Sequence, residues 1–391
     1  MKDLKEIDRY VEKVFPSRER FRERIKEEKL KIYLGIDPTG AHLHLGHATN
    51  LLLLKKLQEM GHKIIFLIGD FTARIGDPTG KEETRNALSE EEIKKNMKSF
   101  QAQASKIIDF EGSNPAEIKF NSEWLDDLTF RETIEIASNF TIQQMIKRDM
   151  FQKRLDESKP IRLHEFLYPL MQGYDSVAME IDAEVGGTDQ TFNMLIGKDL
   201  LEEYKEKEKL VITTKLLEHP KDKKKLMSQS EGETINLDDS SSEMFGQIMS
   251  LDDEVMFQVA KLSTEMSLQK IQKLKEKKAK KAKMEIAFEA TKLYYKKDKA
   301  QKAKEEFKKV FEKKEEPEEK PQIKVDKEKI DIVDLIQKAK IKSRSKAKRL
   351  INQGAVKING QKIKNFSKKI KIKDGDTLQI GKKRFFKLSK N

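Results

Sequence analysis

The sequence predicts an α/β fold in which helices cover a parallel sheet, followed by an all-helical region and a small α+β unit. Three observations support this prediction. A strand, a helix and a second strand follow one another within residues 31–69, and such a βαβ unit implies a parallel sheet. Residues 240–311 carry a helical pattern without a strong strand signal. Residues 329–391 form a strongly basic segment that combines helix and hairpin signals.

The first two strands frame a predicted binding edge. Residues 31–37 read as a buried strand that Pro38 ends, and 63–69 read as a second one. The helix between them runs from about residue 46 to residue 60, with leucines on one face. Ligands of parallel sheets bind beyond the carboxyl ends of the strands. We therefore expect binding residues within 37–47 and 70–85.

The middle of the chain is predicted to be mostly helical. Ser89 and Glu92 form a capping box that opens a helix, and residues from about 90 to 165 continue in this way. Alternation of apolar residues returns at 181–185, which predicts another strand. Residues 312–328 are rich in Lys, Glu and Pro and have little to bury, so they are predicted to be a linker.

The basic C-terminal segment is predicted to fold as a unit of its own. Residues 332–338 and 345–353 read as two short helices, and Gly354 ends the second. Asn359-Gly360 between two apolar stretches predicts a β-hairpin, and residues 373–376 predict a further turn between strands. This pattern indicates a small α+β unit.

The composition excludes several classes of protein. The 391 residues exceed what one ordinary core accommodates, so two or three domains are expected. No apolar run reaches the roughly 18 residues of a membrane helix, and residues 1–15 lack a secretory signal. Because the chain has no cysteine, a disulfide framework, a thiolate nucleophile and a cysteine zinc site are excluded. We expect a cytoplasmic protein without a membrane partner.

The net charge of +13 is concentrated at the C-terminal end. Residues 329–391 contain 20 Lys and Arg against four Asp, whereas the rest of the chain has a small negative excess. A compact basic unit of this kind is typical of a polyanion binder, although a lysine-rich tail that only aids solubility stays open. Few aromatic residues are nearby, which favours phosphate contacts to folded RNA over base stacking. The candidate RNA-binding residues are Arg344, Lys346, Lys348 and Arg349.

A motif of two histidines carries the first chemical signal. In His44-Leu45-Gly46-His47 the imidazoles lie one helical turn apart, at the start of the predicted helix. Free N–H groups at a helix start favour anions, and Gly46 lets another group approach the backbone there. The pattern predicts donors to phosphate oxygens. A metal site that includes His42 lacks the usual further ligands, and two purely structural histidines remain an alternative.

A second glycine-containing loop follows the second strand. Gly76 to Lys81 resembles a phosphate-binding P-loop, but it is one residue too short, and Glu82 stands at the position of the magnesium-binding Ser or Thr. The Gly-x-Gly-x-x-Gly pattern of dinucleotide-binding folds is absent after the first strand. Both of these nucleotide-binding motifs are therefore excluded.

Several motifs in order resemble one known family. Residues 35–39 together with the His-Leu-Gly-His sequence resemble the HIGH signature of class I aminoacyl-tRNA synthetases, and in particular of bacterial tyrosyl-tRNA synthetases. The similarity continues through residues 75–78, 167–175 and 185–190. The basic tail is similar to the ribosomal-protein-type RNA-binding module of these enzymes. The resemblance thus covers nearly the whole chain.

The resemblance implies a ligase that activates L-tyrosine with ATP and Mg²⁺ and transfers it to the 3′ end of tRNA(Tyr). It also implies a homodimer without a tightly bound metal. The implied organisation is a Rossmann-like catalytic domain at 1–218 with a helical insertion at about 90–165, a KMSKS-like loop and helical anticodon-recognition domain at 219–311, a charged linker at 312–328, and the RNA-binding module at 329–391.

The resemblance also assigns a tyrosine-binding site. Tyr33 and Asp175 match the pair that binds the substrate phenol. Such a pair would be left unpaired by phenylalanine, which is how a site rejects an analogue that lacks one hydroxyl. An ordinary helix-surface carboxylate remains the alternative for Asp175. The positions that match the ammonium-binding groups, with one residue beside them, are Asp77, Tyr168, Gln172 and Gln190.

The nucleotide site follows from the same resemblance. Lys81 and Arg85 match positions that hold the departing pyrophosphate, and Asn50 stands near the ribose where relatives often have Thr. His44 and His47 are the expected catalytic donors. The positions that match ATP-binding residues are Asp37, Thr39, His44, Gly46, His47, Gly187, Asp189, Met227 and Ser228.

The second class signature, KMSKS, is altered in this chain. The matching stretch has Leu226 and Gln229 in place of both lysines, while Lys223 to Lys225 directly precede it. Lysine acts on phosphate as a point charge on a flexible stem, so a neighbouring position can serve. We expect Lys225 to be catalytic from this shifted register. The alternative is that this run is only a solvated surface segment.

Three rival functions remain at this stage. A tryptophan-specific relative conflicts with Asp37-Pro38-Thr39 and with the pair formed by Tyr33 and Asp175. An RNA-binding descendant could have lost catalysis through Leu226 and Gln229. A small-molecule nucleotidyltransferase with a similar histidine motif would not explain residues 167–190 or the basic tail.

Overall fold

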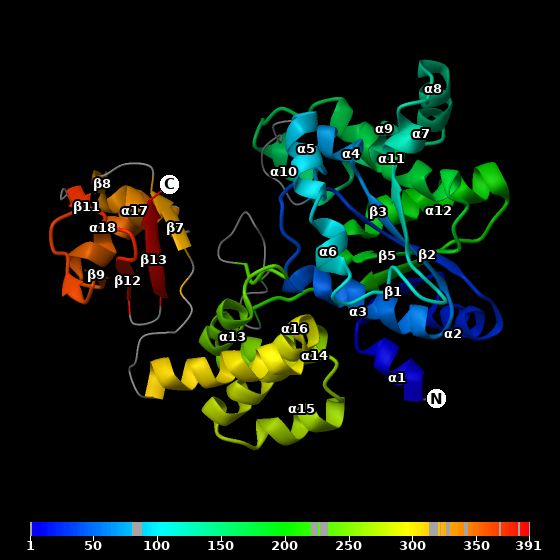
Figure 1. Ribbon diagram of the computed structural model, residues 1–391. Coiled ribbons are helices and arrows are strands. Elements are labelled where there is room, and N and C mark those ends of the chain that lie inside the picture. The colour runs from blue at the N-terminus through cyan, green and yellow to red at the C-terminus, as the bar shows by residue number, and fades with distance from the viewer. Residues whose placement is uncertain are drawn as a thin grey trace. The chain divides into compact units, whose positions relative to one another are not determined.

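The computed structural model describes residues 2–79, 88–219, 226, 234–312, 320, 322–325, 329–339, 343–366, 369–381 and 384–390. The chain divides into two compact units, residues 1–300 and 301–391 (Figure 1). The first unit contains a six-stranded sheet and most of the helices described below.

The sheet of the first unit is parallel except at one edge. Its strand order is β1-β6-β5-β2-β3-β4, and only the pair β1–β6 is antiparallel among the described strands. The predicted α/β class with a parallel sheet is therefore confirmed. The strands are β1 Val11–Phe15, β2 Lys31–Ile36, β3 Lys63–Ile68, β4 Glu117–Phe120, β5 Ala183–Gly187 and β6 Leu210–Thr214.

Helices cover both faces of this sheet (Figure 1). Helix α3 (Leu45–Glu59) lies on one face and buries its run of leucines there, whereas α11 (His164–Ala178) and α12 (Thr191–Lys205) pack together on the other. Gly173 and Gly197 lie in the contact between α11 and α12, where a Cβ on either glycine would approach the other residue to 3.2 Å. The two helices can therefore pack closely.

The region predicted as mostly helical contains one strand of the sheet. Strand β4 pairs in parallel with β3, which corrects the helical assignment of residues 90–165 at that point. The strand has only four residues and alternates weakly, so its pairing partner decides its conformation. The remaining helices here are α4 Thr72–Ile75, α5 Glu90–Met97, α6 Phe100–Ala104, α7 Ser122–Leu125, α8 Phe130–Ser138, α9 Ile142–Ile146 and α10 Asp149–Asp156.

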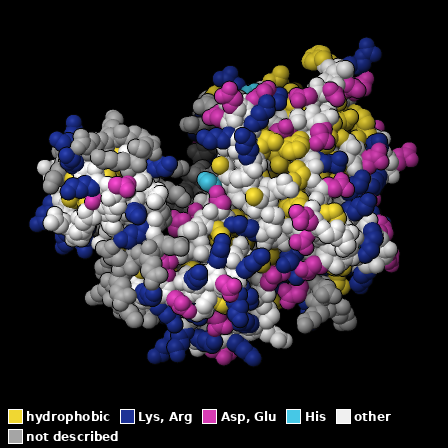
Figure 2. All heavy atoms as spheres, viewed as in Figure 1, with side chains coloured by type: hydrophobic (Ala, Val, Ile, Leu, Met, Phe, Trp, Pro, Cys, Tyr) yellow, Lys and Arg dark blue, Asp and Glu magenta, His cyan; other side chains and the backbone are white. Residues whose placement is uncertain are grey.

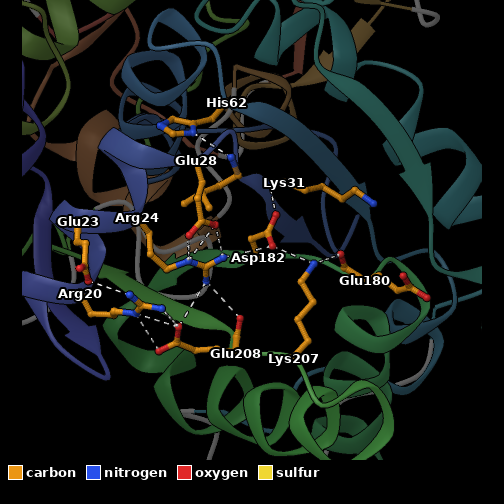
Figure 3. A network of polar contacts seen from close by, with 11 residues as sticks. Arg20, Glu23, Arg24, Glu28, Lys31, His62, Glu180, Asp182, Lys207 and Glu208 are labelled. Carbon is orange, nitrogen blue, oxygen red and sulfur yellow. Dashed lines mark hydrogen bonds and ion pairs between the residues drawn. The ribbon is translucent and has the colours of Figure 1, made fainter.

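Charged side chains join the first helices to the amino ends of β2 and β5 (Figure 3). Asp182, just before β5, accepts a hydrogen bond from the Lys31 backbone N–H at 2.7 Å and pairs with Lys207 at 2.9 Å. The nearly buried guanidinium of Arg24 pairs with Glu28 at 2.9 Å and lies 3.5 Å from Asp182. Because these contacts lie at the amino-terminal edge, they fix the sheet without occupying its carboxyl-terminal edge. The N-terminal helices are α1 Lys2–Asp8 and α2 Arg18–Glu27.

The elements described between residues 240 and 311 are all helices, as the pattern predicted. They are α13 Ser241–Ser250, α14 Asp253–Leu262, α15 Leu268–Lys275 and α16 Ala279–Glu312. Among the described residues, no helix is both long and apolar enough to cross a membrane.

The second unit is the small α+β fold that the basic tail predicted. Its helices α17 (Ile332–Lys338) and α18 (Arg344–Asn352) pack with a sheet in the order β10-β9-β12-β13-β7 and a two-stranded β11-β8 pair. The predicted hairpin turn is present, with positive φ at both Asn359 and Gly360. The strands are β8 Lys329–Asp331, β9 Val356–Ile358, β10 Gln361–Lys362, β11 Lys369–Lys371, β12 Thr377–Ile380 and β13 Arg384–Lys390.

One strand of this unit lies inside the predicted linker. Strand β7 (Gln322–Val325) pairs in parallel with β13, so residues 312–328 are not a linker throughout. Ile323 and Val325 are buried in the core of the second unit. Their alternation was too short to stand out within a Lys/Glu/Pro-rich segment, and the partner strand follows some 60 residues later in the chain.

Candidate active site

The carboxyl ends of the parallel strands bring the expected site residues to one edge of the sheet. Asp37 follows β2, Asp70 follows β3, and Asp189 lies just beyond β5. Strands β2 and β5 are neighbours in the sheet. The chain continues from β2 to β3 on one side and from β5 to β6 on the other, so a crevice is expected between β2 and β5. The structure thus places the start of the first predicted binding segment, residues 37–47, at a topological switch point, and residues 70–79 of the second segment after the adjacent strand β3.

The two histidines of the first motif form the start of α3. His44 is the N-cap, and its Nδ1 accepts the Gly46 backbone N–H at 3.2 Å. His47 Nδ1 accepts the His44 backbone N–H at 3.1 Å, and the two rings stack with centroids 3.9 Å apart. Because each Nδ1 accepts a hydrogen bond, each neutral ring carries its proton on Nε2. Each Nε2–H group is therefore a hydrogen-bond donor.

Both imidazoles are neutral at physiological pH. Burial, with help from neighbouring His47, lowers the pKa of His44 to about 2. Burial also lowers the pKa of His47 to about 4, although nearby Asp189 acts in the opposite direction. These side chains can therefore donate hydrogen bonds to phosphate oxygens without adding positive charge.

Asp37 joins three elements of the site. Its Oδ1 accepts a hydrogen bond from Thr72 Oγ1 at 2.7 Å, and its Oδ2 accepts one from Tyr168 Oη at 2.8 Å. A Cβ on Gly69 would lie 2.1 Å from Asp37 Oδ1, so only glycine leaves room for this arrangement. A hydrogen bond thus joins Asp37, which was predicted to bind the nucleotide, to Tyr168, which was predicted to bind the amino acid.

Asp175 lies at the buried end of the same network. Its side chain accepts hydrogen bonds from Trp124 Nε1 at 2.9 Å and from Asn121 Nδ2 at 3.4 Å. Burial raises the pKa of Asp175, and these two donors partly oppose the shift. Asp175 is only 2% exposed, so it is not a helix-surface carboxylate. The sequence analysis missed Asn121 and Trp124, which a strand assignment for β4 would have placed at this edge.

Tyr33 does not bond to Asp175 directly. Its hydroxyl lies 3.2 Å from the hydroxyl of Ser176, the residue next to Asp175 on α11. Burial raises the pKa of Tyr33 well above its usual value, and the nearby carboxylates of Glu184 and Asp175 add to this shift. The expected phenol-binding pair is therefore brought to one place, with Ser176 as a contact that the sequence did not reveal.

The residues expected at the substrate ammonium form a second chain of hydrogen bonds. Gln190 Nε2 donates to Asp77 Oδ2 at 2.7 Å, and Asn193 Nδ2 lies within hydrogen-bonding distance of the side-chain oxygens of Gln190 and Gln172. Gln172 Nε2 in turn donates to Glu184 at 3.1 Å. Asn193 and Glu184 are additional members that the motifs did not indicate.

Other expected nucleotide-site residues occupy the same edge. A Cβ on Gly187 would lie 2.4 Å from Asp189 Oδ1, so glycine leaves room for that carboxylate. The Asn50 side chain accepts a hydrogen bond from Thr214 Oγ1 and thereby joins α3 to β6. Thr39 belongs to the turn after β2, where its backbone N–H donates to the Asp37 carbonyl at 2.7 Å.

Five predicted residues lie outside the described part of the chain. They are Lys81, Arg85, Lys225, Met227 and Ser228. The segment that follows the KMSKS-like stretch is described, and it pairs with the start of the histidine motif. Ile235 accepts the Leu45 backbone N–H at 3.0 Å, and Leu237 donates to Leu43 at 2.8 Å. These contacts hold residues 235–237 beside the start of the histidine motif.

Comparison with known proteins identifies the family. The family model "tRNA synthetases class I (W and Y)" matches residues 25–312, and the model "Tyrosine--tRNA ligase SYY-like C-terminal domain" matches residues 312–388. The chain therefore belongs to the class I tRNA synthetases of the tryptophan and tyrosine type. This family uses ATP.

Relatives of the chain include tyrosine--tRNA ligases. The chain is 43% identical to the tyrosine--tRNA ligase of Thermotoga maritima over 95% of this chain and 94% of that protein. It is 42% identical to the tyrosine--tRNA ligase of Carboxydothermus hydrogenoformans over 99% and 97%, respectively. A C-terminally truncated mitochondrial tyrosyl-tRNA synthetase from Aspergillus nidulans has the same fold, with a TM-score of 0.68 at 23% identity over 79% of this chain and 93% of that one.

The neutral state of the histidines leads to a prediction about pH. Replacing His47 with Asn keeps a neutral donor, so the ratio of wild-type to His47→Asn activation rates should stay constant from about pH 6 to about 8.5. His47→Ala should cost on the order of 10²-fold, because the donor is lost. Pyrophosphate exchange at saturating substrates measures both effects.

The matched control is His42→Asn. His42 lies in the same loop but is exposed and contacts Asp238, so activity should be unchanged. A wild-type to His47→Asn ratio that falls as pH rises through about 6.5 would show that a charged imidazole is required, contrary to this prediction.

Proposed function

We propose that this protein activates L-tyrosine with ATP to form tyrosyl-adenylate and then transfers tyrosine to the 3′ end of tRNA(Tyr). The observation that supports this best is the buried polar cluster around Asp175. There Asp175 is held by Trp124 and Asn121, and the hydroxyl of Tyr33 lies beside the neighbouring Ser176. Full-length relatives named tyrosine--tRNA ligase support the same reaction.

The chemistry requires positioning and charge stabilisation. The tyrosine carboxylate attacks the α-phosphorus in line and pyrophosphate leaves, so the protein needs no covalent intermediate. The Nε2–H groups of His44 and His47 are donors for the phosphate oxygens. The adenylate is then captured by a ribose hydroxyl of the tRNA.

Magnesium is proposed to arrive with ATP. Among the described residues, no group of three or more His, Asp or Glu side chains is placed to hold a metal ion by itself. The ion would bind together with the triphosphate and neutralise charge on its β- and γ-phosphates. Lys81, Arg85 and Lys225 are proposed to add positive charge at the same end of the nucleotide.

Selectivity for tyrosine is proposed to come from unpaired polar groups. Phenylalanine would leave the Tyr33 hydroxyl and the Asp175 carboxylate without the hydrogen bonds that the substrate phenol supplies. Asp77, Gln172 and Tyr168 are proposed to hold the substrate ammonium. Tryptophan would likewise present no phenol to this pair, which disfavours the tryptophan-specific alternative.

The second unit is proposed to bind tRNA. Arg344, Lys346, Lys348 and Arg349 all lie on α18 and are exposed. Arg344 also pairs with Asp334 at 2.5 Å, and all four cations are proposed to contact phosphates. The helices of residues 241–312 are proposed to recognise the anticodon. A tRNA substrate implies action in the cytoplasm, where translation takes place.

A homodimer is proposed through an exposed apolar face of the first unit. Figure 2 shows hydrophobic side chains gathered over α8, α9 and α11. Phe130 is 81% exposed, Ile142 70% and Leu163 79%. Contiguous apolar surface of this kind marks an interaction site, and a second copy of the chain is the occupant we propose.

Pyrophosphate exchange into ATP with each standard amino acid tests the reaction. We expect exchange with tyrosine alone, because only its side chain satisfies both Tyr33 and Asp175. Chelation of Mg²⁺ should abolish the exchange. Exchange with tryptophan would reveal a different specificity, and no exchange with any amino acid would favour an RNA-binding descendant.

The same assay tests the lysine run beside the altered KMSKS motif. Lys225→Ala should lower the exchange rate, since this side chain is proposed to take the place of the two missing lysines. Unchanged exchange in this variant would argue against the shifted register and leave the histidines as the main donors.

Charge reversal on α18 tests the proposed tRNA contacts. In the triple variant Lys346→Glu, Lys348→Glu and Arg349→Glu, the KM for tRNA should rise on the order of 10-fold or more and depend less on salt. Pyrophosphate exchange should be unchanged, since it needs no tRNA. Matched reversals at the exposed Lys13, Lys26 and Lys63 should leave charging intact. Equal losses in both triple variants would mean that the effect is not specific to α18.

The proposed dimer predicts the molecular mass of the protein in solution. Sedimentation should give about twice the 45.5 kDa of the chain. Phe130→Lys combined with Ile142→Lys should give monomers, because each places a charge in the buried interface. Leu268→Lys, at an isolated exposed leucine on α15, is the control that should remain dimeric. A monomeric wild type would contradict this proposal.

A further inference from the structure

A buried ion pair contacts Ser176 and Gln172 of the proposed tyrosine site and has no role in the functions described so far. Lys209, just before β6, is 0% exposed, and Glu184 of β5 is 2% exposed. The Lys209 ammonium pairs with the Glu184 carboxylate and also donates to Ser176 Oγ at 2.7 Å and to the Met194 carbonyl at 3.0 Å. All three N–H groups of Lys209 are thereby used.

The surrounding fold makes room for this ammonium group. A Cβ on Gly197 would lie 2.5 Å from Lys209 Nζ and 2.8 Å from Ser176 Oγ. Taking two charges out of water is costly, and an apolar pair of similar size is often at least as stable. Stability therefore does not explain why the chain keeps a lysine here, and the partners of the pair indicate a different role.

Lys209 acts on the phenol end of the site through Ser176. An ammonium group can only donate, so Ser176 Oγ must accept from it. The hydroxyl proton of Ser176 is then free to point toward Tyr33, 3.2 Å away. If Ser176 donates to Tyr33, the Tyr33 proton is left for the oxygen of the substrate phenol, whose own proton can go to Asp175. The N–H donor of Lys209 thus sets the donor-to-acceptor direction of every hydrogen bond from Ser176 through Tyr33 to the substrate phenol.

Glu184 acts on the ammonium end of the site, and it does so as a hydrogen-bond acceptor, whereas Lys209 acts as a donor. A carboxylate can only accept, so Gln172 must present its amide N–H₂ to Glu184, at 3.1 Å. The amide oxygen of Gln172 then faces the other way, toward Asn193. An amide oxygen is the end that binds a substrate ammonium, whereas a reversed amide would present donors to it.

We propose that the Lys209–Glu184 pair is a positioning device that sets the hydrogen-bond direction on both sides of the tyrosine site. Lys209 orients Ser176 and Tyr33 toward the substrate phenol, and Glu184 orients Gln172 toward the substrate ammonium. Neither residue touches substrate. The inference rests on the proposed tyrosine specificity and adds two specificity-determining residues to it.

The central experiment removes both charges together. In the variant Lys209→Met/Glu184→Gln no buried charge is left unpaired, so the fold should be retained, which a thermal melt verifies. Without the donor, Ser176 and Gln172 can reverse their hydrogen bonds. We expect the ratio of kcat/KM for tyrosine over phenylalanine to fall ~10-fold or more, with the KM for ATP changed less than about twofold.

Two further variants separate positioning from loss of stability. Arg9→Met removes another fully buried cation, which bonds the Lys261 and Met266 carbonyls away from the site. It should lower the melting temperature and leave the tyrosine to phenylalanine ratio unchanged. Ser176→Ala should lower the tyrosine to phenylalanine ratio. Adding Lys209→Met/Glu184→Gln to Ser176→Ala should lower this ratio little further, because both changes act through the same series of hydrogen bonds.

A glycine pair tests the same idea without any change of charge. Gly197→Ala would push against Lys209 and Ser176, and more weakly against the Gly173 backbone, and should lower the ratio, whereas Gly246→Ala on α13 meets no atom within 4 Å and should not. An unchanged ratio in the active Lys209→Met/Glu184→Gln variant, or an equal loss in Arg9→Met, would overturn the inference. Failure of the wild type to exchange with tyrosine would instead overturn the proposed function.

Discussion

The carboxylate of Asp37 is the contact on which the rest of the site depends. One oxygen accepts the hydroxyl of Thr72, the first residue of α4, and the other accepts the Tyr168 hydroxyl from α11. The single side chain that follows β2 thus connects this strand to α4 and to α11. Thr72 continues the network, because its hydroxyl also accepts from Asn121, which reaches Asp175. The residues predicted to bind the nucleotide and those predicted to bind the amino acid therefore belong to one hydrogen-bonded network.

Donor and acceptor balance explains why these groups can be buried. Buried polar groups are costly unless each one is satisfied, and a fully connected network holds a single arrangement of side chains. His44 and His47 follow the same logic, since each Nδ1 is satisfied by a backbone N–H and each Nε2 carries the ring proton. A site of this kind is organised before substrate arrives, so little reorganisation is needed during the reaction.

The sequence predicted those elements whose signals are local. The βαβ unit, the capping box at Ser89 and the hairpin at Asn359-Gly360 all depend on neighbouring residues, and the structure contains each of them. Strands β4 and β7 were missed because each has only four residues and becomes a strand only through its partner. Missing β4 also concealed Asn121 and Trp124, two donors to the buried carboxylate of Asp175.

The sequence by itself therefore determined the α/β class, the basic C-terminal unit and the ordered motifs around His44, Asp77 and Asp175. These are properties of short segments, and the physical rules that shape them act over a few residues. Only the tertiary structure decided that Ser176 stands between Tyr33 and the buried Lys209, and that Glu184 orients Gln172. Those contacts join residues from different strands and helices, and hydrogen bonds across such distances in the chain leave no periodic signal.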